Sequence, residues 1–123
     1  MVTQLTYRNQ SKSFLEQAYS ELRAGDLRQA SEKGWGAAAQ IVKAAAEARG
    51  WDHNHHRLLF EVVSRLSLDQ EDRDIGRLFG AANFLHSNFY EGGLDEATVT
   101  AALEDVERLV EKLEALLPAV STE

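Results

Sequence analysis

The segment from Asp26 to Gly50 is the part of the sequence that most constrains the fold. At about 100° per residue, its alanine, glycine, isoleucine and valine residues cover more than half of the circumference of an α-helix. Its polar residues are confined to a narrow strip. A helix that is apolar over so much of its surface belongs inside a bundle, with neighbours on several sides. We therefore predict an all-α fold, an up-and-down bundle of four to five helices packed around this segment.

Other segments show the spacing of amphipathic helices that would surround it. We expect helices at about 11–24 and 70–90, a third that ends near Leu66, and a last one between Asp95 and Pro118. These helices place residues 11–117 in a single bundle domain. The remaining residues are predicted to be a loose lead-in at 1–10 and a polar tail at 118–123.

Capping residues indicate where the helices begin and end. Gly50 suits the left-handed conformation that ends a helix, and Asp26 is predicted to cap the segment that follows it. We expect Asp52 or Asn54 to cap the third helix and Asp69 to cap the fourth.

The last helix carries an apolar seam with alternating steps of four and three residues. The seam is too short for an independent coiled coil, so we expect it to pack within the chain, against the segment 26–50 or the helix at 70–90. A zipper between two chains is the alternative. The seam consists of Val99, Leu103, Val106, Val110, Leu113 and Leu117.

Charge and composition exclude several classes of protein. The net charge is −7, and residues 61–123 carry five Lys and Arg against fourteen Asp and Glu. Because phosphate backbones are bound by clustered cations, we predict no DNA binding by this half. The chain has no cysteine for disulfides or zinc. It also shows neither a membrane-length apolar run nor a signal peptide pattern, so a cytoplasmic protein is expected.

Three polar residues near the end of the fourth predicted helix form the candidate site. Asn83, His86 and Tyr90 follow a spacing of three and four, which aligns them along one edge of a helix. His86 lies on or beside the apolar face, where an imidazole serves as acid, base or hydrogen-bond donor. The alternative is a structural histidine, bonded to Tyr90, Asn83 or a backbone carbonyl.

A second group of histidines lies in the connection before the third helix. His53, His55 and His56, joined by His86, would supply nitrogen ligands for a metal ion. Adjacent histidines point in different directions, so we predict neither a metal site nor a cofactor.

Two stretches resemble HEPN domains (higher eukaryotes and prokaryotes nucleotide-binding), and the PaREP-type branch in particular. They are FLEQAYSELRAGDLRQASEKGWGAAAQIVKAAAEARGW at 14–51 and LFGAANFLHSNFYEG at 78–92. The resemblance implies an up-and-down bundle that forms a homodimer and works beside a minimal nucleotidyltransferase. Some HEPN proteins are RNA-cleaving toxins of toxin–antitoxin pairs, whereas others bind nucleotides or partner proteins.

The resemblance also implies where a catalytic arginine would stand. In HEPN ribonucleases an arginine precedes the histidine by four to six intervening residues, but positions 79–81 before His86 are not arginine. Arg77 lies further upstream, and Arg49 has the spacing only with the loop residue His55.

We therefore predict no catalytic residues. The expected function is a non-catalytic homodimeric module that binds a nucleotide or a partner protein through Asn83, His86 and Tyr90, with Trp35 or Trp51 nearby. The alternative is a metal-independent endoribonuclease toxin in which Arg49, Arg77 or an arginine of a second subunit replaces the usual one.

Overall fold

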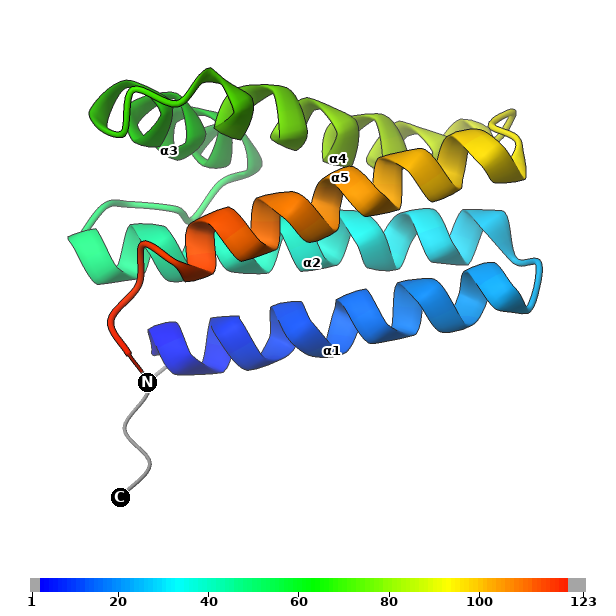
Figure 1. Cartoon of the computed structure of the whole chain (residues 1–123), viewed down its shortest axis with the longest axis horizontal. Helices are drawn as coiled ribbons and strands as arrows, with labels where there is room; N and C mark the ends of the chain where they lie inside the picture. The colour runs from blue at the N-terminus through cyan, green and yellow to red at the C-terminus, as the bar shows by residue number, and fades with distance from the viewer. Residues whose placement is uncertain (1–2, 120–123) are drawn as a thin grey trace.

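The computed structural model describes residues 3–119, and in that range the chain is a bundle of helices without a strand (Figure 1). The all-α prediction is therefore confirmed. Within this part of the chain, no helix combines the length and the apolar character that crossing a membrane requires. The helices are α1 (Gln4–Arg23), α2 (Leu27–Arg49), α3 (His56–Asp69), α4 (Arg73–Glu91) and α5 (Glu96–Glu114).

Helix α2 lies at the centre and contacts each of the other four helices (Figure 1). Its small side chains allow this close packing. Ala37, Ala38 and Ala45 are fully buried, and Gly34 sits where α2 meets both α4 and α5. A Cβ atom at Gly34 would lie only 2.5 Å from a methyl group of Leu103. The predicted inner helix is thus confirmed, and glycine avoids a close contact with the leucine side chains at this crossing.

Helix α1 begins at Gln4, so the predicted loose lead-in at 1–10 is wrong for the residues that are described. The side chain of Thr3 caps the helix by accepting a hydrogen bond from the N–H of Thr6. Arg8 then reaches the far end of the chain, where its guanidinium lies 2.6 Å from the Glu114 carboxylate. These long-range contacts order a segment whose local pattern shows no clear period. The polar tail predicted at 118–123 lies mostly outside the described residues.

The connection between α3 and α4 lies about three residues later in the chain than predicted. Helix α3 continues to Asp69, which therefore ends a helix rather than capping the next one. Asp72 caps α4 by accepting a hydrogen bond from the N–H of Asp74, and its other carboxylate oxygen lies 2.8 Å from the Lys112 ammonium. The ion pair with α5 and the left-handed backbone of Glu71 fix the turn at this position.

Helix α5 packs against α2 and α4 within the chain, as expected for its seam. One position of the seam differs from the prediction: Leu109 is fully buried, whereas Val110 is only partly buried. The other five positions of the seam, including Leu113 and Leu117 at its end, are buried as predicted.

Candidate functional site

The candidate site is formed by three rings from three different helices, which we call the histidine–tryptophan cluster: Trp35, His56 and His86. Trp35 on α2 stacks on His56 with ring centres 4.8 Å apart, and it lies 4.7 Å from His86 on α4. The two imidazole rings are 5.3 Å from each other. Residues distant in the sequence therefore meet at one place, where α2, α3 and α4 converge.

The sequence explains how these helices hold the three rings. Trp35 is 8% exposed because it lies on the central helix, under the other two rings. His56 is the first residue of α3, so the short connection after α2 places the imidazole ring of His56 against Trp35. On α4, the buried Phe79 packs against Trp35 at 5.6 Å and against Phe60 at 5.0 Å. The cluster thus packs on the buried ring of Phe79, which the more exposed Phe60 contacts in turn.

His86 lacks the hydrogen bond that a purely structural histidine would make. Its Nδ1 atom is buried and has no hydrogen-bond partner among the described residues. The ring of Tyr90 meets the imidazole in a T-shaped arrangement, with 5.3 Å between the ring centres. A buried polar atom without a partner costs about 1–3 kcal/mol of stability. An unsatisfied nitrogen beside two aromatic faces is a feature expected of a binding site.

The pKa of His56 is lowered from its ordinary value of 6.5, mainly by partial desolvation of its ring and further by its electrostatic interaction with His86. His56 is therefore neutral at pH 7. A neutral imidazole offers one hydrogen-bond donor and one acceptor, besides a ring face for stacking.

The structure brings together two of the three residues predicted for the site. Tyr90 lies beside His86 and is 66% exposed, so its ring is open to a ligand. Asn83 lies three residues before His86 on α4 and is half-buried. The buried amide nearby is instead Asn88, which bonds to Ser31 at 2.8 Å and to the backbone N–H of Leu94 at 3.1 Å. These two bonds give Asn88 a structural role.

A pocket of about 190 Å³ adjoins the cluster on the side of the connection between α2 and α3. His53, His55 and His56 all line it, and so does Lys43 of α2. The sequence analysis did not single out Lys43. It was detectable there, because Trp35 and Lys43 are eight residues apart and therefore share one face of α2.

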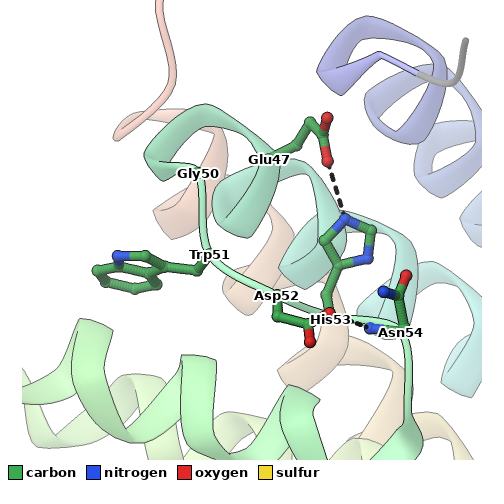
Figure 2. A pocket seen from close by; sticks show the side chains of 6 residues that line it. All are labelled: Glu47, Gly50, Trp51, Asp52, His53 and Asn54. Carbon is green, nitrogen blue, oxygen red and sulfur yellow. Dashed lines mark hydrogen bonds and ion pairs between the residues drawn. The ribbon is translucent and has the colours of Figure 1, made fainter.

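The connection that borders this pocket is held by His53. Its Nε2 atom donates to the carboxylate of Glu47 at 2.9 Å (Figure 2), and its ring meets Tyr7 edge-on at 5.3 Å. Asp52, expected to cap α3, accepts instead from the N–H of Asn54. The predicted cap is therefore wrong: the N-cap of α3 is His55, and its side chain makes no capping bond.

The tryptophan of the connection and the arginines named for RNA cleavage lie apart from His86. The guanidinium of Arg65 covers the ring of Trp51 at 3.7 Å, and that of Arg49 lies 5.7 Å from the same ring. Arg77 pairs with Asp74 at the start of α4. At 1.5 Å per residue, Arg77 is about 13 Å from His86 along the helix.

The histidines do not form a metal cage in the described part of the chain. No group of three or more His, Asp or Glu side chains there is placed to hold a metal ion. The arrangement instead offers aromatic faces, imidazole donors and acceptors, and one ammonium group. These are the contacts that bind a flat, polar ligand.

Comparisons with known proteins place the chain among archaeal proteins. Residues 6–110 match the model of the archaeal PaREP1/PaREP8 family. The fold resembles the crystal structure of a protein from Sulfolobus solfataricus, with a TM-score of 0.79 and 28% identity over 89% of this chain and 97% of that one. No functionally curated protein matches the sequence.

Proposed function

The chain belongs to the archaeal PaREP1/PaREP8 family, and we propose that it is a non-catalytic, HEPN-like module that binds a nucleotide at the histidine–tryptophan cluster. The observation that carries the proposal is the buried Nδ1 atom of His86, which lacks a hydrogen-bond partner within the described chain. A nucleobase that supplies this partner would relieve the cost of the unsatisfied atom.

The surroundings of His86 support the same class of ligand. His56 and Tyr90 are exposed at the edge of the cluster and offer ring faces for a base. Stacking of a base on an aromatic side chain contributes about 1–3 kcal/mol in single-stranded nucleic acid complexes. Trp35 lies beneath the histidines, where it holds their rings in place rather than stacking on a ligand.

The test is a titration of the purified protein with ADP and GDP, followed by calorimetry. We expect saturable binding of at least one nucleotide. His86→Ala should weaken that binding by about tenfold to a hundredfold, the range for one lost hydrogen bond plus stacking. Ser87→Ala, on the exposed side of the same helix turn, is the control. If His86→Ala lowers the melting temperature sharply while affinity is unchanged, the imidazole is structural and the proposal fails.

The proposed assembly is a homodimer that uses the outer face of α3 and α4. Leu68 is 77% exposed and Phe84 59% exposed there, and large exposed apolar side chains of this kind mark interfaces when they lie together. Between the two helices lies an apolar groove of about 400 Å³, lined by Phe60, Leu68 and Gly80 among others. Phe84 follows Gly80 by one turn of α4.

Light scattering at several concentrations tests the dimer. Phe84→Asp should yield a monomer, whereas Leu5→Asp, at an exposed leucine of α1, should not change the mass. A wild-type protein that stays monomeric at high concentration would contradict this part of the proposal. Copurification of a small nucleotidyltransferase, with no nucleotide bound, would instead assign the surface to a protein partner.

RNA cleavage is the second candidate function, favoured by the proximity of two imidazoles, His56 and His86. Such a pair is able to act as base and acid in turn. Charge that develops on a phosphate also needs a cation, and the described arginines discussed above lie elsewhere. The pure protein would then cleave RNA in the presence of a chelator, and His86→Ala would abolish the cleavage. That result would decide for this candidate.

A further inference from the structure

The pocket beside the histidine–tryptophan cluster has an unusual charge for an acidic protein. The residues that line it are Trp35, Ala39, Lys43, His53, Asn54, His55, His56 and Leu59, and none of them is a carboxylate. The net charge of the chain, in contrast, is −7. This small cavity therefore gathers one lysine and three of the four histidines of the sequence.

Lys43 is a cation without a counter-ion in the described part of the chain. It is half-buried, it forms no ion pair there, and its ammonium lies 6.0 Å from the ring centre of Tyr7. The carboxylate one turn further along α2, Glu47, is bound to His53 at 2.9 Å. Partial burial of an unpaired charge is unfavourable, and an anion in the pocket would offset that cost.

The backbone at the pocket also favours an anion. Asp26, Asp72 and Asp95 cap α2, α4 and α5 with a carboxylate oxygen, whereas His55 gives α3 no such bond. The first turn of α3 also contains no acidic residue. The N–H of Leu58 already donates to the His55 carbonyl, so it is the positive end of the helix dipole that adds to the attraction that Lys43 exerts on an anion.

We propose that this pocket, which we call the Lys43 pocket, binds the phosphate end of a nucleotide whose base lies at the histidine–tryptophan cluster. The inference rests on the proposed function, and it names the ligand class: a nucleoside phosphate, not a nucleoside. His56 links the two regions, because it lines the pocket and also stacks on Trp35. A ligand that spans both would contact all three helices of the site.

The first test compares three probes by calorimetry: ADP, adenosine and inorganic pyrophosphate. We expect ADP to bind more tightly than adenosine and pyrophosphate to bind by itself. Lys43→Met keeps most of the apolar stem over Tyr7, yet it should weaken ADP by about tenfold or more, because a hydrogen bond to a charged group is lost. Adenosine affinity should not change. Lys33→Met, on the same helix but over the ring of Phe14, is the matched control.

A second test introduces the side-chain cap that α3 lacks at position 55. Stability and anion binding are then expected to change in opposite directions. His55→Asp supplies the capping oxygen and should raise the melting temperature, while its negative charge expels pyrophosphate and ADP. His55→Asn supplies a cap without a charge. It should also raise the melting temperature and should retain more of the affinity than His55→Asp does.

The outcomes separate this inference from the proposed function. If ADP and adenosine bind equally well and Lys43→Met changes neither, the inference is overturned while nucleotide binding stands. If pyrophosphate binds and Lys43→Met weakens it, but neither ADP nor adenosine binds more tightly than pyrophosphate, the pocket is an anion site and the proposed function fails. If neither these probes nor GDP bind, both the inference and the proposed function are wrong.

Discussion

Replacement of His86 by phenylalanine is expected to stabilise the protein and to weaken nucleotide binding by about tenfold. Phenylalanine has nearly the shape of histidine, so the ring should remain packed against Trp35 and Tyr90. The substitution removes the buried Nδ1 atom, which has no hydrogen-bond partner among the described residues. The same atom is the one that we propose a ligand would satisfy.

The magnitude follows from two opposing effects. Relief of a buried unsatisfied polar atom gains about 1–3 kcal/mol. The slightly larger ring must fit into a filled core, where overpacking costs about 1 kcal/mol at the lower end of its range. The free energy of unfolding should therefore rise by up to about 2 kcal/mol. For a domain of this size the melting temperature should rise by up to about 8 °C.

The assay is thermal and urea unfolding, followed by far-UV circular dichroism, alongside the nucleotide titration. His86→Ala is the informative control, because it removes the same nitrogen but leaves a cavity. Both variants should weaken nucleotide binding, whereas their stabilities should change in opposite directions. A lower melting temperature for His86→Phe, despite an intact helical spectrum, would mean that the nitrogen is satisfied in the folded protein, and the reasoning would be refuted.

Three further predictions concern packing and pH. Gly34→Ala should lower the free energy of unfolding, measured in urea, by about 1–3 kcal/mol through overpacking, because the new Cβ would lie 2.5 Å from a leucine methyl of α5. Gly80→Ala is the control: its new Cβ would meet no atom within 4 Å, so the substitution should be stabilising in the same assay. Stability should fall as the pH drops below 6.5, because the pKa of His56 is lowered in the folded state and the unfolded chain therefore binds the proton more readily. His56→Gln should reduce the dependence of the unfolding free energy on pH, measured by urea titrations between pH 5 and 8. Burial and a hydrogen bond to Glu107 raise the pKa of Tyr19, so the folded state keeps its proton and stability should fall as the pH rises above 10, a loss that Tyr19→Phe should remove.

Periodicity predicted the architecture because the dominant interactions are encoded locally. The apolar arc of α2 identified the central helix, and the predicted cap at Asp26 was correct, with a side-chain oxygen bonded to the N–H of Gln29. The last helix begins after Asp95, as expected. Gly50 adopts the left-handed conformation that was expected of it. These features depend on neighbours within a few residues, which a sequence displays directly.

The errors arose where distant residues decide the local structure. Helix α1 extends to Gln4 because Arg8 is anchored by Glu114 at the other end of the described chain. The candidate site was located only in part for the same reason. Spacing on α4 placed His86 beside Tyr90, but nothing local indicated that His56 would stack on Trp35.

The central position of α2 has a consequence for how the chain tolerates changes in length. Trp35 and Lys43 lie on one face of this helix, and removal of a residue between them would rotate one relative to the other by about 100° and shift it by about 1.5 Å. The base region and the phosphate region of the proposed site would then face different neighbours. Insertions and deletions should therefore be confined to places such as the glycine turn at 92–93, while the length of the α2 segment between these two residues stays constant.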